Sequence, residues 1–190
     1  MKTIRILITG VGGQGTLLAS RVLGGLAGEL GCDVKVSEVH GMAQRGGSVV
    51  TYVCLGDHVA SPLIEQGEAD FLLAFEQLEA VRYMHMVRPG GTVVVNTQTI
   101  APMPVITGAA AYPEGLLDTL QEAGLKVVAV DALRLAEQAG NARTVNTALM
   151  GALARQMEVP QEVMLRTLAR IVPEKTVEVN QAAFRLGYEG

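Results

Sequence analysis

Three glycines near the start of the sequence have the spacing of a phosphate-binding loop. They form the pattern G-x-G-x-x-G in the stretch GVGGQG, between an apolar run that predicts a strand and a periodic run that predicts a helix. Glycines permit a tight turn and a close approach of backbone to a phosphate, and the N-terminus of the following helix favours an anion. The pattern predicts an anion- or coenzyme-binding loop made of Gly10, Gly12, Gly13, Gln14, Gly15 and Thr16.

The same spacing leaves two other interpretations open. Glu38 ends the second predicted strand, about where an acid that binds the ribose of a dinucleotide would lie. A stand-alone NAD(P)- or flavin-binding module is therefore one alternative. The other is that the glycines serve only the turn and helix packing, with Glu38 solvated. A self-contained dehydrogenase is disfavoured because no second domain is present to hold a substrate and no histidine or lysine has an obvious acid–base partner. We predict no catalytic residue in this chain.

A second glycine-rich segment, SEVHGMAQRGGSV at 37–49, predicts a loop. Arg45, next to Gly46 and Gly47, can offer a planar cation to a phosphate or carboxylate. Gln44 and His40 can add hydrogen bonds, and Met42 an adaptable apolar contact. The alternative is a pure subunit interface, with Arg45 paired to a carboxylate of a partner. The residues expected at this partner or coenzyme interface are Glu38, His40, Met42, Gln44, Arg45, Gly46, Gly47 and Ser48.

These loops need a framework of strands and helices, and the hydrophobic pattern predicts one. Short apolar runs predict strands at 3–9, 33–39, 48–55, 71–75, 92–96 and 125–131, and helical periodicity predicts helices from about 18 to 30, at 76–87, at 113–124 and through most of 131–187. Alternating strands and helices indicate a mainly parallel sheet. We therefore predict a single α/β domain, with a Rossmann-like core at 1–130 and a helical C-terminal extension at 131–190.

The first predicted helix contains Gly24, Gly25 and Gly28, each of which costs up to about 1 kcal/mol relative to alanine. We expect close packing of this helix on the sheet or on a neighbouring helix to compensate.

Composition narrows the class of protein. Among 190 residues, 49% are hydrophobic and 18% charged, which is typical of a buried α/β core. Fifteen basic residues against nineteen acidic, without a basic cluster, argue against nucleic-acid binding. No apolar stretch reaches the roughly 20 residues of a membrane helix. The two cysteines of the chain form no paired framework and fit a reducing interior, so the sequence predicts a cytoplasmic protein.

The sequence also lacks the ligands of several redox cofactors. Its two cysteines, Cys32 and Cys54, cannot supply the four thiolates of an iron–sulfur cluster. There is no H-E-x-x-H or C-x-x-C spacing for a metal, and no Gly-Asp-Gly stretch to anchor thiamine diphosphate. We predict no metal site and no cofactor held by this chain.

The two loops together resemble a known family. GVGGQG followed by SEVHGMAQRGGSV is similar to the gamma-type subunits of 2-oxoacid:ferredoxin oxidoreductases, and the form HGMAQRGG is most similar to the small (beta) subunit of indolepyruvate:ferredoxin oxidoreductases. The resemblance continues through 61–96 and through NTALMGALAR at 146–155, so that it covers nearly the whole chain.

The resemblance implies a subunit that is inactive alone. In such enzymes a large (alpha) subunit carries thiamine diphosphate and [4Fe-4S] clusters, and the complex converts aryl 2-oxoacids to aryl-acetyl-CoA while it reduces ferredoxin. The small subunit would line the active-site entrance and contact coenzyme A, or it would be a structural assembly subunit without a ligand. An isolated subunit of this kind would expose apolar surface and could form a homodimer.

Overall fold

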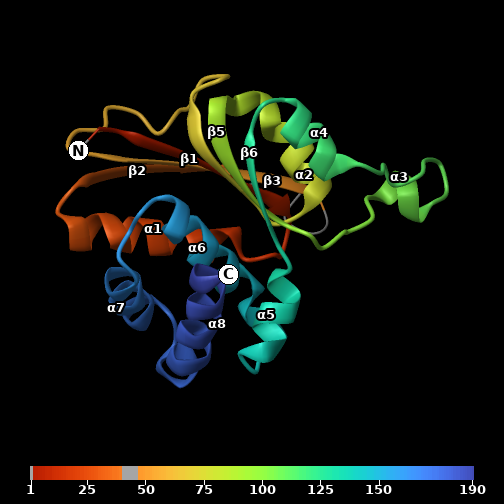
Figure 1. The fold of residues 1–190 in the computed structure, drawn as a ribbon. Coiled ribbons are helices and arrows are strands. Elements are labelled where there is room, and N and C mark those ends of the chain that lie inside the picture. The colour runs from red at the N-terminus through yellow and green to blue at the C-terminus, as the bar shows by residue number, and fades with distance from the viewer. Residues whose placement is uncertain (1, 40–46) are drawn as a thin grey trace.

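A computed structural model of the chain describes residues 2–39 and 47–190, and within them one six-stranded sheet forms the centre of the molecule (Figure 1). The strand order is β2-β3-β1-β4-β5-β6. The strands are β1 (Ile4–Val11), β2 (Asp33–Glu38), β3 (Ser48–Gly56), β4 (Ala69–Ala74), β5 (Val87–Asn96) and β6 (Lys126–Val130).

The sheet is mainly parallel, as the alternation of strands and helices predicted. β1, β4, β5 and β6 pair in parallel, whereas β3 pairs antiparallel with both β1 and β2. The reversed direction of β3 was not predicted. The signal was present, because the segment between β2 and β3 is shorter than the dozen residues that a parallel crossover needs.

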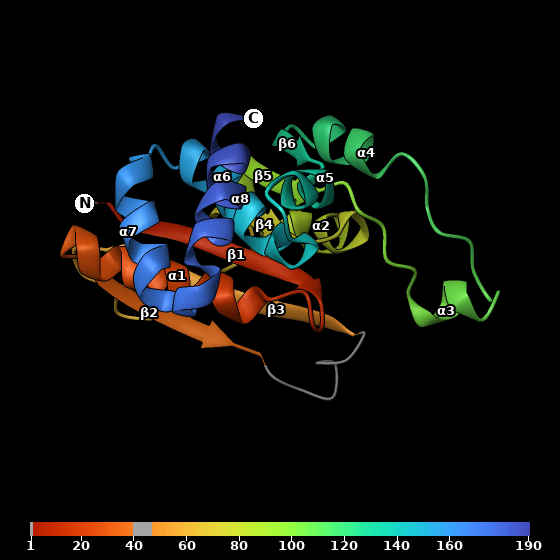
Figure 2. The ribbon, with the colours of Figure 1, turned by 90° about the horizontal axis from the view of Figure 1, so that it is seen from below.

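Helices cover both faces of this sheet (Figures 1 and 2). α1, α5, α6, α7 and α8 lie on one face, and α2 and α4 on the other. The α-helices are α1 (Thr16–Leu30), α2 (Gln77–Tyr83), α3 (Met103–Ile106), α4 (Leu116–Glu122), α5 (Ala132–Gln138), α6 (Val145–Gln156), α7 (Gln161–Ile171) and α8 (Val177–Glu189). Short 3-10 turns lie at Met84–Met86, Ala142–Thr144 and Glu174–Thr176.

The central strand β1 is buried on both faces. Ile6 and Ile8 point into the core under α1 and the C-terminal helices, and Leu7 between them points into the smaller core under α2 and α4. All three side chains have 0% exposure. This burial explains why the strand is a continuous apolar run rather than an alternating one.

The C-terminal helices, predicted as an extension, share the larger core with the sheet. α6 packs on β5 and α7 packs on α1. α6 and α8 touch backbone to backbone: a Cβ on Gly187 would lie 1.9 Å from the carbonyl oxygen of Ala148, and one on Gly151 would lie 2.2 Å from the carbonyl oxygen of Phe184. These two positions accept only glycine without separating the helices.

The glycines inside α1 differ from one another. A Cβ on Gly25 would lie 2.7 Å from Cδ1 of Ile171 and 2.9 Å from Cγ2 of Thr167, so the expected close packing is present there, against α7. A Cβ on Gly24 or Gly28 would meet no atom within 4 Å. For these two glycines the packing explanation is wrong within the described part of the chain.

One segment leaves the body of the molecule. Residues 97–115, between β5 and α4, project to one side and carry the short helix α3 near the far end (Figures 1 and 2). The hydrophobic pattern did not predict α3. We call residues 97–113 the arm.

Candidate functional site

The glycine loop joins the end of β1 to the start of α1, as predicted, and its backbone demands glycine. Gly13 and Gly15 have φ angles of +100° and +89°, in the left-handed region that other residues adopt only with strain. A Cβ on Gly10 would lie 3.0 Å from Cβ of Phe75. The N–H of Gly12 donates to the carbonyl oxygen of Gly47, at 2.8 Å, and so ties this loop to the end of the second one.

Gln14 holds the loop in place. Its side-chain oxygen accepts the N–H of Val11 at 2.7 Å, and its side-chain nitrogen donates to the carbonyl oxygen of Phe75 at 3.0 Å. Phe75 follows β4 directly, so the Gln14 amide connects the loop to the neighbouring strand. Its polar groups are thus engaged within the chain, and the shape of the loop does not depend on a ligand.

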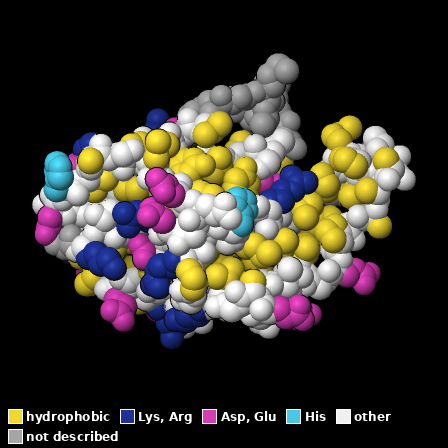
Figure 3. Space-filling view, turned by 90° about the horizontal axis from the view of Figure 1, so that it is seen from above, with side chains coloured by type: hydrophobic (Ala, Val, Ile, Leu, Met, Phe, Trp, Pro, Cys, Tyr) yellow, Lys and Arg dark blue, Asp and Glu magenta, His cyan; other side chains and the backbone are white. Residues whose placement is uncertain are grey.

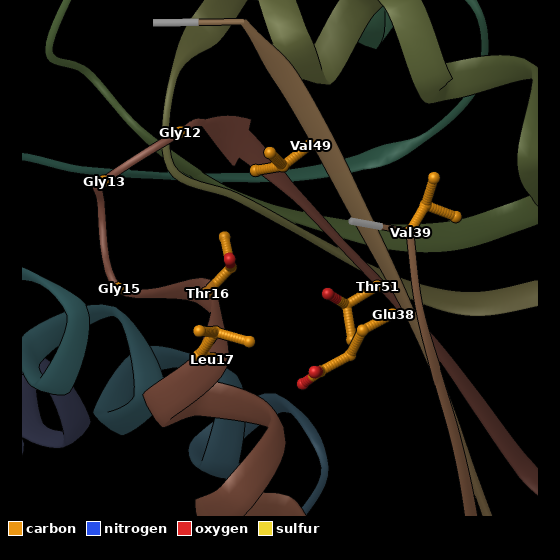
Figure 4. Close-up of a pocket in the computed structure, with 9 residues that line it drawn as sticks. All are labelled: Gly12, Gly13, Gly15, Thr16, Leu17, Glu38, Val39, Val49 and Thr51. Atoms are coloured by element: carbon orange, nitrogen blue, oxygen red, sulfur yellow. The ribbon is translucent and has the colours of Figure 1, made fainter. Parts of the chain in front are cut away.

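A cavity of about 310 Å³ lies on one side of the loop, between the start of α1, the end of β2 and the start of β3 (Figure 4). Glu38 lines it and bridges the two elements, because its carboxylate accepts the hydroxyl of Ser20 on α1 at 2.5 Å. The residues that line the cavity are Gly12, Gly13, Gly15, Thr16, Leu17, Glu38, Val39, Val49 and Thr51. Glu38 gives this side of the loop acidic character.

This arrangement differs from a dinucleotide site. In the dinucleotide-binding fold the second strand lies beside the first, which brings its terminal acid to the ribose. Here β3 lies between β1 and β2, which places Glu38 one strand farther from the loop. The G-x-G-x-x-G spacing is therefore present without the strand order that makes it a dinucleotide fingerprint.

A second cavity, of about 510 Å³, lies on the opposite side of the same loop. Arg143, exposed at the turn before α6, and Asn146, in the first turn of α6, line it together with Gly13 and Gly15. A Cβ on Gly15 would lie 2.5 Å from the side-chain nitrogen of Asn146, so loop and helix are in close contact. Gln98, at the base of the arm, also faces this cavity.

Arg143 was not among the predicted site residues. Its neighbour Asn146 begins the stretch NTALMGALAR, but nothing in the residue pattern shows that this stretch folds back onto a loop about 130 residues earlier in the chain. The structure thereby brings a cation to the side of the loop away from Glu38.

Ser48 does not face the cavity that Glu38 lines. Side chains alternate along β3, so Val49 and Thr51 face α1 while Ser48 faces the other side of the sheet. There its hydroxyl donates to the carboxylate of Glu79 and lies 3.4 Å from the hydroxyl of Tyr83. The residues expected to act together around the second loop are thus divided between two faces.

Glu79 belongs to a buried acidic pair at the start of α2. It is 3% exposed and forms an ion pair with Arg82, with 2.9 Å between Oε1 and Nη1. Glu76, 1% exposed, caps the helix by accepting the N–H of Glu79 at 3.0 Å. Neither glutamate was expected from the sequence, although Glu76 lies two residues after the end of β4 and Glu79 five.

The remaining predicted residues of the second loop, His40, Met42, Gln44, Arg45 and Gly46, lie outside the described residues. Their assignment to a partner or coenzyme interface stays a prediction.

The described residues form neither a metal cluster nor a membrane-spanning helix. Residues 2–39 and 47–190 bring no group of three or more His, Cys, Asp or Glu side chains together in a way that could hold a metal ion. None of the helices in this part of the chain is both long enough and apolar enough to cross a membrane.

The two thiols lie in different cores. Cys32 is half-buried against the larger core, and Cys54 is buried in the smaller one, where desolvation raises the pKa of its thiol.

Residues 5–190 match the family described as pyruvate ferredoxin/flavodoxin oxidoreductase, and the chain belongs to this family. One relative is the indolepyruvate oxidoreductase subunit IorB of Thermococcus kodakarensis, which is 44% identical over 98% of this chain and 95% of its own length. The resemblance that the two loops suggested is confirmed.

Solved structures share the fold. Pyruvate oxidoreductase subunit PORC of Thermotoga maritima superposes with a TM-score of 0.74 at 23% identity, over 100% of this chain and 97% of its own. A 2-oxoglutarate:ferredoxin oxidoreductase from Magnetococcus marinus, solved with coenzyme A, gives 0.74 at 18% identity over 100% of this chain and 31% of its own. The fold therefore occurs both as a separate chain and as part of a longer one.

Proposed function

We propose that this chain is the small, cofactor-free subunit of an indolepyruvate:ferredoxin oxidoreductase. The observation that carries the proposal is 44% identity, over nearly the full length of both chains, to a protein named as an indolepyruvate oxidoreductase subunit. The reaction converts an aryl 2-oxoacid and coenzyme A to aryl-acetyl-CoA and CO₂, with two electrons passing to ferredoxin.

The side chains in the described part of the chain do not suit the redox groups that this reaction needs. An iron–sulfur cluster takes four thiolates, whereas Cys32 and Cys54 point into cores on opposite faces of the sheet. Thiamine diphosphate is held through a divalent metal, and no cluster of acidic or histidine side chains in 2–39 and 47–190 could hold one. We propose that the large subunit holds both groups.

The role left to this chain is to bind and position coenzyme A at the subunit boundary. We propose that the glycine loop takes an anionic part of the coenzyme on the side that faces Arg143. Backbone alone lines the loop at Gly13 and Gly15, which permits a close approach, and Arg143 supplies a cation. The opposite side is less suitable for an anion because Glu38 lies there.

Arg143→Ala tests the coenzyme assignment in the assembled enzyme. We expect the KM for coenzyme A to rise about 10-fold, as the loss of one charge-assisted contact predicts, with the KM for indolepyruvate unchanged. Arg185→Ala, which removes an equal charge from the exposed face of α8, is the control and leaves both constants unchanged. Equal KM values for coenzyme A in the two variants would contradict the assignment.

The proposed reaction is tested by substrate preference. The complex of this chain with its large subunit is given indolepyruvate, pyruvate or 2-oxoglutarate, and the reduction of a viologen dye is followed in the presence of coenzyme A. We expect kcat/KM for indolepyruvate to exceed the other two. A complex that prefers pyruvate or 2-oxoglutarate would overturn the indolepyruvate assignment.

A further inference from the structure

The arm is uncharged and exposed. Residues 97–113 contain no Asp, Glu, Lys, Arg or His, although such residues are frequent elsewhere in the chain. Met103 and Ile106 of α3 are 63% and 65% exposed, and most of 101–111 is exposed as well. Hydrophobic side chains gather on the projecting part of the molecule at the right of Figure 3. Apolar surface of this kind, on an element that leaves the body of a protein, marks a contact with another molecule.

The base of the arm is fixed by one buried carboxylate. Oε1 of Glu76 accepts the N–H of Ile100 at 3.3 Å and the hydroxyl of Tyr112. The same side chain caps α2 through its other oxygen, which accepts the N–H of Glu79. The two ends of the arm, twelve residues apart, therefore meet at a group that is itself held by a helix.

The far end of the arm is folded as well. The N–H of Ala110 donates to the carbonyl oxygen of Pro104 at 3.0 Å, and the N–H of Gly108 donates to that of Val105 at 3.1 Å. The backbone is thus ordered by its own hydrogen bonds while Met103 and Ile106 stay exposed. An element ordered in advance loses little entropy on binding, which favours a docking role.

The arm and the glycine loop lie at the same end of the sheet, because the arm follows β5 and the loop follows the parallel strand β1. A cavity of about 280 Å³ is lined by Met103 and Pro104 of the arm and by Val11, Gly47 and Ser48 of the strand ends and loops. A partner that covers the glycine loop would therefore meet the arm too.

We propose that the arm is a docking element for the large subunit of the oxidoreductase, a proposal that rests on the proposed function. An uncharged arm requires an apolar groove in its partner and gives no attraction to nucleic acid or to a charged surface. The arm is contiguous with the loops that face the coenzyme, so the partner that completes that site is also the one within reach. The same fold also occurs as less than a third of a longer chain.

The test replaces both exposed side chains with charge. Met103→Glu/Ile106→Glu changes residues that touch little of their own chain, so the free subunit should melt within about 2 °C of the wild type. The Kd for the separately purified large subunit should rise at least about 100-fold, as expected for charge placed in an apolar contact. Leu63→Glu is the matched control, because Leu63 is 68% exposed and lies between β3 and β4, at the opposite end of the sheet. The Kd of this variant for the large subunit should stay within about twofold of the wild-type value.

A second measurement needs no variant. Amide hydrogen exchange across 101–111 should slow at least about 10-fold when the wild-type chain binds the large subunit. Unchanged exchange in a complex that has formed would overturn the proposal.

The failures are distinguishable. A double variant that binds as tightly as Leu63→Glu overturns the role of the arm and leaves the proposed function standing. A double variant that loses self-association but still binds the large subunit overturns docking to the large subunit and shows that the arm binds a second copy of this chain. A wild-type chain that does not bind the large subunit at all overturns both the arm and the proposed function.

Discussion

Two apolar regions of this molecule differ in where their partners lie. The contact between α6 and α8 is closed within the chain, where Leu149, Leu153 and Phe184 are fully buried and Gly151 and Gly187 let the helices touch. The arm presents Met103 and Ile106 to solvent, and nothing in the described part of the chain covers them. Stability and the proposed assembly thus depend on separate regions, so that substitutions can change one without the other.

The largest effect on stability is expected at the closed contact. Gly187→Ala places a Cβ 1.9 Å from a backbone oxygen of α6, which cannot move aside as a side-chain tip can. We expect the free energy of unfolding to fall by at least about 3 kcal/mol, measured by urea denaturation. Gly190→Ala, at the end of the same helix, is the control with little effect. A variant as stable as the wild type would show that the two helices are not held backbone to backbone.

A smaller effect is expected at the base of the arm. Tyr112→Phe removes the hydroxyl that donates to the buried carboxylate of Glu76, and we expect a loss of about 1 kcal/mol. Burial, and then the hydrogen bond to Glu76, raise the pKa of Tyr112 above its ordinary value. The contribution of the hydroxyl is therefore fully present below the ordinary tyrosine pKa of about 10 and is lost as the pH rises through the higher folded value.

Urea denaturation of both proteins at several pH values checks this sign. The difference between wild type and Tyr112→Phe should be constant from about pH 6 to 9 and should shrink above about pH 10. A difference that grows at high pH would contradict the hydrogen bond to Glu76.

The smallest effect distinguishes two neighbouring glycines of α1. Gly24→Ala meets no atom within 4 Å and should stabilise the chain by about 0.5–1 kcal/mol through helix propensity. Gly25→Ala, one residue along the same helix, is the matched control and should not stabilise, because its Cβ would crowd Ile171 and Thr167 of α7. Thermal melting of the two variants measures the difference, and equal stabilisation would show that α7 does not pack there.

Much of the fold could be predicted from the sequence because it depends on local patterns. Runs such as 3–9 and 92–96 are apolar since their strands are buried on both faces. Pro160 and Pro173 lie directly before α7 and directly before the last 3-10 turn, because proline cannot continue a helix that precedes it. The direction of β3 was missed because apolar runs carry no information on which way a strand runs; only the short connection after β2 carries it.

The site was predicted only in part, for a related reason. Gly13 and Gly15 were identifiable because a left-handed turn needs glycine. Arg143 and Asn146 reach the same loop through tertiary packing, which no local pattern encodes. Ser48 was grouped with Glu38 by proximity in sequence, whereas alternation along β3 sends it to the other face of the sheet.

The division of labour between two polypeptides is the central claim, and one titration tests it most directly. This chain and the large subunit are purified separately, and indolepyruvate-dependent reduction of a viologen dye is measured as one is added to the other in the presence of coenzyme A. We expect no turnover by either chain alone and a rate that rises to saturation on mixing. Full turnover by either chain alone, or none by the mixture, would contradict the account.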